Sequence, residues 1–202
     1  MGMVQPKAPG RQKSRERKRL TAGDWADAAL AAMAERGLAA VAVEPLAARL
    51  GTTKGSFYWH FANREALIEA ALLRWEELCT EEIITALEAE PDPETRLRML
   101  FHEATASAAD DPLEVSLLAT AAHPQVAATL RRVTERRVRY VAQLFEELGF
   151  PPEAARQRGL LAYTSYLGHT QLTHAVPQTL PAGAERDAYL ESMMDTLLRR
   201  DA

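Results

Sequence analysis

Residues 43–64 read VEPLAARLGTTKGSFYWHFANR, and this stretch decides the fold of the 202-residue chain. Leu46 and Leu50 give a short helix an apolar face, and Gly51 can adopt the left-handed conformation that ends it. Phe57 and Phe61 lie four residues apart and are expected to pack a second helix against the first. The pattern predicts helices at about 43–50 and 54–60, joined by a tight glycine turn, as in a helix-turn-helix.

Capping residues at the helix ends support this prediction. Pro45 lies in the first turn of the first helix, where a missing N–H costs little. Thr52 and Thr53 offer hydroxyls to cap the second helix, with Thr53 the better placed. Asn63 is a good N-cap for the helix that follows, and Glu65 in its first turn is favoured by the helix dipole.

The second helix is expected to turn one polar and aromatic face to solvent, away from Phe57 and Phe61. The residues of this face are Lys54, Ser56, Tyr58, Trp59 and His60, and Gly55 allows another backbone to approach. Such a surface suits the base edges and phosphates of DNA. Two alternatives remain open: Trp59 either enters the groove or packs on the neighbouring helix, and His60 could simply cap the helix end.

Charge is distributed unevenly along the chain. The net charge is −4, but residues 1–20 hold seven basic side chains against Glu16, which leaves −10 on the rest. A basic head on an acidic body indicates that a polyanion docks at one end. Residues 1–17 are expected to form a disordered basic arm, and Arg17, Lys18 and Arg19 to contact phosphates or the minor groove. The alternative is a solubilising tail.

The composition and the spacing of proline and glycine residues indicate an all-α protein. Apolar residues make up 47% of the chain and charged residues 26%, as in ordinary globular proteins, and strand-like alternation hardly occurs. Cys79 is the only cysteine, which excludes a disulfide framework or a thiolate zinc cage within one chain. The sequence contains no apolar run long enough to span a bilayer and no signal-peptide stretch, so we expect a cytoplasmic protein that does not bind membranes.

Proline and glycine residues divide the chain into further segments of helical length. Helices are expected at about 21–36, 63–89, 93–109, 112–120, 124–148, 152–174 and 184–200. The last two carry heavy apolar stripes: Leu160, Leu161, Tyr163 and Leu167, then Tyr189, Leu190, Met193, Met194 and Leu197. These helices either occupy the centre of the bundle or meet a second copy of themselves.

The stretch LAARLGTTKGSFYWHFANREALIEA resembles the TetR family of transcriptional repressors over roughly residues 18–78. The resemblance implies a three-helix DNA-binding domain at 18–78 and a helical domain at 79–202 for dimerisation and ligand binding. It implies DNA contacts by Thr53, Lys54, Gly55, Ser56, Tyr58, Trp59 and His60, and a phosphate contact by Arg64. One departure is Ala42, which stands where the family often has a capping threonine.

The resemblance also implies partners. A homodimer through the last two helices would read a palindromic operator in double-stranded DNA, and a small-molecule effector would release it. Candidate ligand-lining residues are polar or aromatic side chains among apolar helix faces. They are Trp75, Cys79, Phe101, His102, His123, Tyr140, Tyr163, Tyr166, His169 and Thr170.

Two other functions compete with this prediction. A constitutive DNA-binding dimer would lack the ligand. A helical enzyme would pair Cys79 with His102 or His123, but Cys79 lies inside a long helix with no loop to expose it, so we expect no enzyme activity. No histidines stand four residues apart, and no carboxylate spacing completes a metal site, so neither a metal nor a cofactor is expected.

Overall fold

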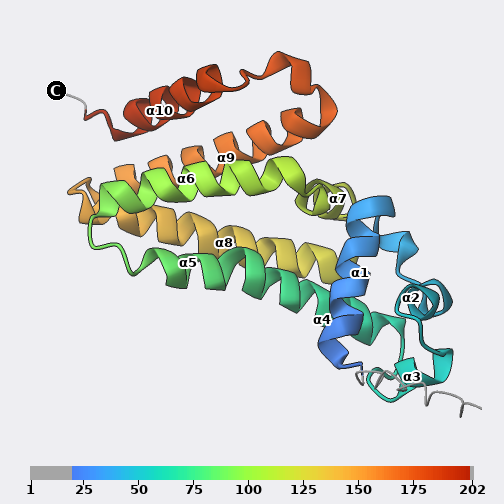
Figure 1. The fold of residues 1–202 in the computed structure, drawn as a ribbon. Coiled ribbons are helices and arrows are strands. Elements are labelled where there is room, and N and C mark those ends of the chain that lie inside the picture. Colours follow the sequence, from blue (N-terminus) through green and yellow to red (C-terminus); the bar gives the residue numbers. More distant parts are fainter. Residues whose placement is uncertain (1–19, 201–202) are drawn as a thin grey trace, which may run out of the picture.

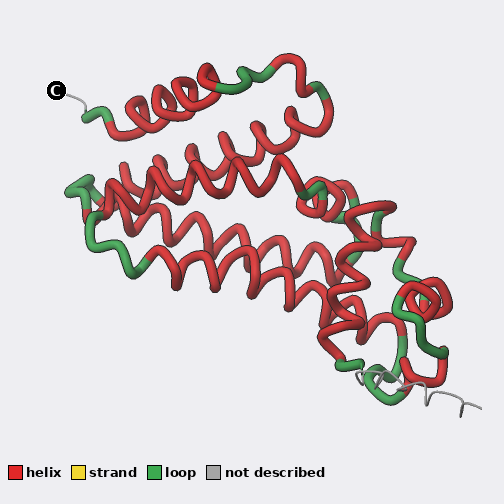
Figure 2. The backbone as a smooth tube through the Cα atoms, in the orientation of Figure 1, coloured by secondary structure: helices red, strands yellow, loops and turns green. Residues whose placement is uncertain are grey.

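The computed structural model describes residues 20–200, and within them every regular element is a helix (Figures 1 and 2). The α-helices are α1 (Ala22–Arg36), α2 (Val43–Arg49), α3 (Lys54–Tyr58), α4 (Arg64–Glu76), α5 (Glu82–Leu87), α6 (Pro93–Asp110), α7 (Leu113–Ala119), α8 (Pro124–Glu147), α9 (Pro152–Ala175) and α10 (Ala184–Leu198). The all-α prediction is confirmed. The predicted arm at residues 1–17 lies outside the described residues.

Helix α1 begins and ends where its capping residues require. The Thr21 side chain accepts a hydrogen bond from the Asp24 amide, and the Asp24 carboxylate accepts one from the Thr21 amide, which forms a capping box. Gly37 ends the helix with a φ of 76°, a region that favours glycine. Trp25 and Met33 are fully buried, which confirms the predicted inner face of this helix.

Helices α2 and α3 form the predicted helix-turn-helix. Gly51 ends α2 with a φ of 64°. Phe57 is fully buried, and its ring packs edge-on against Trp25 of α1 at 5.4 Å between centroids. Thr53 occupies the N-cap position of α3 as predicted, but its side chain makes no capping hydrogen bond, so this part of the prediction is wrong. Ala42 likewise leaves the start of α2 without a side-chain cap.

The long helix that was predicted from Asn63 to about Ala89 contains a π-helical turn. Asn63 caps α4 by accepting a hydrogen bond from the Ala66 amide at 2.8 Å, as predicted. Residues Glu77–Glu81 then form one π turn before α5 continues the same rod. This turn inserts one extra residue into the helical spacing, so buried Trp75 is followed by buried Thr80 rather than by residue 79.

The remaining helices form a bundle that carries the helix-turn-helix group at one end (Figure 1). Helices α8 and α9 make the most extensive contact, and Gly159 permits it because a Cβ there would lie 3.0 Å from the Ala142 amide nitrogen. One hydrophobic cluster joins α1–α4 to α7 and the first half of α8, and a second fills the bundle. Within residues 20–200, no helix is long and apolar enough to cross a membrane.

The two apolar stripes near the C-terminus have different environments. Leu190, Met194 and Leu197 of α10 are buried in the second cluster. Leu160 and Leu161 of α9 instead remain 52% and 53% exposed. Burial within a single chain therefore accounts for the stripe of α10 but not for all of the stripe of α9.

Candidate DNA-binding surface and ligand cavity

Helix α3 has one buried side and one exposed side. Phe57 anchors it in the core, whereas the side chains of Tyr58 and Trp59 are 57% and 84% exposed. The Tyr58 ring still packs edge-on against Phe57 at 5.1 Å, which limits its freedom. Trp59 was expected either to enter the DNA groove or to pack on the neighbouring helix. Its indole is exposed to solvent, so it does not pack on the neighbouring helix.

Lys54 on the same helix forms an ion pair across the turn. Its Nζ lies 2.9 Å from Oε1 of Glu44 in α2, and both side chains are more than half exposed. The hydrogen bond with Glu44 raises the pKa of Lys54, and the same contact lowers the pKa of Glu44. Lys54 therefore keeps its positive charge at the tip of α3.

The other residues predicted to contact DNA gather beside these. Thr53, Gly55, Ser56, Trp59 and His60 line one surface depression together with Leu20, the first described residue. The chain therefore enters the described structure directly beside α3. Arg17, Lys18 and Arg19 lie outside the described residues.

Arg64 is oriented differently from the remaining predicted DNA contacts. Its Nε donates a hydrogen bond to the Val41 carbonyl at 2.6 Å, and its Nη2 donates one to the Leu38 carbonyl at 2.9 Å. These carbonyls belong to the connection between α1 and α2, so Arg64 ties the start of α4 to that connection.

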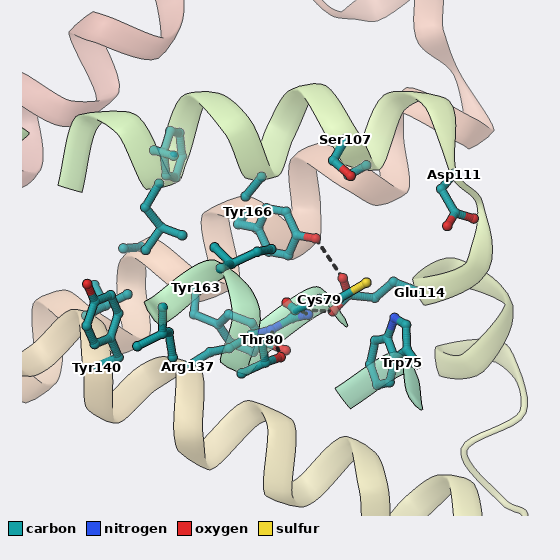
Figure 3. Close-up of a pocket in the computed structure, with 18 of the residues that line it drawn as sticks. Trp75, Cys79, Thr80, Ser107, Asp111, Glu114, Arg137, Tyr140, Tyr163 and Tyr166 are labelled. Carbon is teal, nitrogen blue, oxygen red and sulfur yellow. Dashed lines mark hydrogen bonds and ion pairs between the residues drawn. The ribbon is translucent and has the colours of Figure 1, made fainter. Parts of the chain in front are cut away.

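A cavity of about 120 Å³ lies where the two hydrophobic clusters meet (Figure 3). Helices α4 to α9 and the π turn all contribute to its wall. Six of the ten predicted ligand-lining residues line it: Trp75, Cys79, Phe101, Tyr140, Tyr163 and Tyr166. These six residues come from five separate segments of helix and meet at one cavity.

The other four candidates lie elsewhere. His102 lies on the side of α6 that faces α10, 40% exposed, with its Nε2 3.9 Å from Oε1 of Glu191. His123 precedes α8 as its N-cap residue. His169 is buried and stacks on Tyr189 of α10 at 6.0 Å, and Thr170 is also buried outside the cavity lining. Neighbouring positions on a helix face different directions, which residue type alone does not reveal.

The sequence analysis missed the polar core of the cavity, which is a network around Arg137 and Glu114. Arg137 Nη1 donates to Glu114 Oε1 at 2.8 Å, and the two side chains are only 15% and 8% exposed. Arg137 also donates to the Thr80 hydroxyl at 3.0 Å and to the Cys79 carbonyl at 2.8 Å. Its guanidinium lies 5.5 Å from the centre of the Trp75 ring, within the range of a cation–π contact.

Two tyrosines extend this network. The Tyr166 hydroxyl donates to Glu114 Oε2 at 2.6 Å, and Tyr163 shares a hydrogen bond of 3.2 Å with Thr134. Burial raises the pKa of Tyr166 far above its ordinary value, and the nearby Glu114 carboxylate acts in the same direction. Tyr166 therefore remains a neutral donor at any physiological pH. Burial likewise raises the pKa of the Cys79 thiol, which opposes a nucleophilic role.

Nothing in the sequence separates Arg137 from its neighbours, because the segment ERRVRY holds three arginines within five residues. Glu114 did carry a signal of a buried charge, because it lies between Leu113 and Val115 in a short, mainly apolar helix. Among the described residues, no group of histidine, cysteine or carboxylate side chains could hold a metal ion.

The structure joins an N-terminal helix-turn-helix with one exposed face to a helical bundle that contains a cavity. Residues 26–71 match the family model described as bacterial regulatory proteins of the tetR family. The match covers the helix-turn-helix and its flanking helices, and it confirms the resemblance to the tetR family noted in the sequence. No curated protein matches the chain significantly.

Solved structures share the whole fold. A transcriptional regulator from Rhodococcus sp. Rha1 aligns with a TM-score of 0.69 at 21% identity, over 89% of this chain and 94% of its own. FadR from Bacillus subtilis, solved with stearoyl-CoA, aligns with a TM-score of 0.67 at 14% identity, over 88% and 98%. AibR, solved with isovaleryl coenzyme A and operator DNA, gives 0.62 at 18%, over 88% and 97%.

Proposed function

We propose that this chain is a dimeric repressor that binds operator DNA through α3 and leaves it when a small molecule occupies the cavity. The observation that carries the proposal is the division of α3 into one face buried by Phe57 and another that exposes Tyr58, Trp59 and Lys54. Two neighbouring aromatic side chains with this exposure form an apolar patch of the kind that marks an interaction site. The solved complex of AibR with operator DNA has the same fold.

In this proposal α3 lies in the major groove. Thr53, Lys54, Gly55, Ser56, Tyr58, Trp59 and His60 face the duplex. Arg17, Lys18 and Arg19 continue the chain from Leu20, which lies beside α3, and we propose that they reach phosphates or the minor groove. To Arg64 we assign a supporting role, because two hydrogen bonds hold it on the Leu38 and Val41 carbonyls.

The dimer is proposed to form through α9 and α10. Leu160, Leu161 and Leu172 leave three large apolar side chains exposed on α9, at 52%, 53% and 42%. Leu161 and Leu172 are eleven residues apart and point to the same side of the helix, and Leu160 lies about 100° from Leu161 and widens the exposed surface. A two-fold dimer through this side would present two α3 helices to successive turns of a palindrome.

Helix α7 is proposed to couple the cavity to the DNA-binding domain. Glu114 holds Arg137 and Tyr166 at the cavity, and two residues later the Ser116 hydroxyl donates to the Met33 carbonyl at 2.7 Å, near the end of α1. Leu117 packs into the same hydrophobic cluster as α1. A ligand that shifts Glu114 therefore shifts α1, and α3 moves with it.

DNA binding is tested with the intergenic fragment upstream of the gene, measured by fluorescence anisotropy over a range of salt concentrations. We expect steep salt dependence, and Lys54→Ala should reduce the slope of log K against log salt by about 1. Tyr58→Ala should weaken binding by about 1–3 kcal/mol. Arg139→Ala, an exposed cation in the middle of α8, is the matched control. Equal effects of Lys54→Ala and Arg139→Ala would refute the proposed interface.

The dimer is tested by sedimentation of Leu161→Arg against Leu73→Arg. The two leucines have nearly equal exposure, 53% and 51%, but Leu73 lies on α4 outside the proposed interface. We expect Leu161→Arg to yield monomers and Leu73→Arg to leave the dimer intact. A dimer that survives Leu161→Arg, or a wild-type chain that sediments as a monomer, would contradict the proposed interface.

A further inference from the structure

We infer that the cavity takes a small uncharged molecule, a mainly apolar compound with one hydrogen-bonding oxygen, and rejects carboxylates, phosphates and organic cations of equal size. This inference rests on the proposed function, because it names the class of effector that the regulator would sense. Three features carry it: the size of the cavity, the balance of its buried charges and the hydrogen-bonding groups that remain free.

The size of the cavity limits the ligand. On the scale where a single water needs about 10–15 Å³, a cavity of about 120 Å³ has room for roughly eight to twelve non-hydrogen atoms. A single benzene ring with a short substituent has this size. The stearoyl-CoA bound by the Bacillus subtilis structure is several times larger, so the shared fold does not carry over its ligand.

The buried charges are already paired within the protein. Of the described residues that line the cavity, Arg137 is the only basic one, and Glu114 neutralises it at 2.8 Å. Thr80 and the Cys79 carbonyl occupy two further nitrogens of the same guanidinium. An anionic ligand would meet the Glu114 carboxylate, and no uncompensated cation would offset its lost hydration.

A cationic ligand has a similar difficulty. Both carboxylate oxygens of Glu114 already accept short hydrogen bonds, one from Arg137 and one from Tyr166. The other lining carboxylate, Asp111, is exposed to solvent at the rim and accepts a hydrogen bond from the Leu113 amide. A buried ammonium would therefore lie close to the Arg137 cation without a carboxylate of its own.

The groups that remain are neutral hydroxyls that suit an uncharged oxygen, among them that of Tyr140, which is buried in the cavity wall without a hydrogen-bond partner among the described residues. The Thr80 hydroxyl accepts from Arg137, and within residues 20–200 its own proton has no acceptor, so it can donate to a ligand. The Ser107 hydroxyl on the cavity rim makes no hydrogen bond within the described part of the chain. The opposite walls, with Ile84, Leu97 and Phe101, are apolar and suit a hydrocarbon ring.

The experiment compares three probes with the same ring: benzyl alcohol, benzoate and benzylammonium, together with stearate. Binding to the full chain without DNA is measured by calorimetry and by the shift in Tm. We expect benzyl alcohol to bind at least about tenfold more tightly than either ion, and stearate not to bind. Equal or tighter binding of either ion, binding of stearate, or no binding of benzyl alcohol would overturn the inference.

Two variants test whether the probes bind in this cavity and whether the Arg137–Glu114 pair excludes anions. Ala104→Phe fills the cavity and should abolish the Tm shift caused by benzyl alcohol. Glu114→Gln leaves the Arg137 charge without its carboxylate, so benzoate should gain at least about tenfold in affinity while benzyl alcohol changes little. Tyr166→Phe alters the same network without changing its charge and should keep the wild-type order of probes. Benzoate affinity that is unchanged in a folded Glu114→Gln protein would refute the charge argument.

These outcomes are separable from those for DNA binding. If benzyl alcohol binds and DNA does not, the proposed repressor function fails and the ligand inference stands. If DNA binds and none of the probes does, the inference fails and the regulator stands as a ligand-independent one.

Discussion

The Arg137–Glu114 pair allows the energetics of the cavity to be predicted quantitatively. Both side chains are nearly buried, at 15% and 8% exposure, and their oxygen and nitrogen atoms are 2.8 Å apart. Removing one partner of such a pair costs about 3–5 kcal/mol, because the other charge stays buried without compensation. In a domain of this size that loss corresponds to a decrease in Tm of about 6–20 °C.

The perturbation is a double-mutant cycle with Glu114→Leu, Arg137→Met and the double variant. Each single variant should lose about 3–5 kcal/mol of unfolding free energy. In Glu114→Leu the Tyr166 hydroxyl also loses its acceptor, and in Arg137→Met the Thr80 hydroxyl and the Cys79 carbonyl lose their donor. The double variant leaves no buried charge, so it should be more stable than either single variant.

The assay is urea unfolding followed by circular dichroism, with the slope m compared across the four proteins. The free energies are compared only if the slopes agree. Single variants that each lose less than about 1 kcal/mol, or losses that simply add in the double variant, would contradict this prediction, because the pair would then behave like an exposed one.

Three further predictions concern other contacts. Arg64→Met should lower the unfolding free energy by about 1–3 kcal/mol through two lost charge-assisted hydrogen bonds, measured by urea unfolding; a loss below about 0.5 kcal/mol would contradict this. Gly159→Ala should lower Tm, because its Cβ would lie 3.0 Å from the backbone of α8, whereas Gly23→Ala, whose Cβ meets nothing closer than 3.6 Å, should not; equal effects would contradict the close packing. Burial and the nearby Arg186 lower the pKa of His169 below 6.5, so the folded chain binds its proton less readily than the unfolded chain, and stability should fall as pH decreases through about 6.5. His169→Gln should lose part of this decrease in unfolding measured between about pH 7.5 and about pH 5.5, and an unchanged pH dependence would contradict it.

The sequence predicted the helices well because their ends carry local signals. Two residues cap the start of a helix by accepting a hydrogen bond from its first amides, namely Thr21 and Asn63. Two glycines with positive φ end a helix, namely Gly37 and Gly51. Each of these signals depends on the residue itself and its near neighbours, so it is recognisable in the sequence. The all-α fold class followed from the composition, the lack of strand-like alternation and the proline and glycine breaks between helical segments. Domain organisation followed from the resemblance.

The candidate site was only partly predictable, and the reason is geometric. Aromatic residues such as Tyr163 and Tyr166 were selected by type, and their helix faces the cavity. His102 was selected for the same reason but faces Glu191 of α10 rather than the cavity, because a shift of one position on a helix turns a side chain by about 100°. Arg137 was missed because a buried arginine is recognisable only from its partner Glu114, which lies 23 positions away in sequence.

The π turn at Glu77–Glu81 has a consequence for how this chain tolerates deletions. Buried positions along the rod include 68, 72, 75, 80, 84 and 87, and a single-residue deletion between 76 and 80 would convert this series to 68, 72, 75, 79, 83 and 86. The positions in that series are three or four residues apart throughout, which is the spacing of one face of an ordinary α-helix. The segment therefore holds one residue more than a continuous α-helix would need to bury the same face. This extra residue widens the helix at the π turn, where Thr80 and the Cys79 carbonyl contact Arg137.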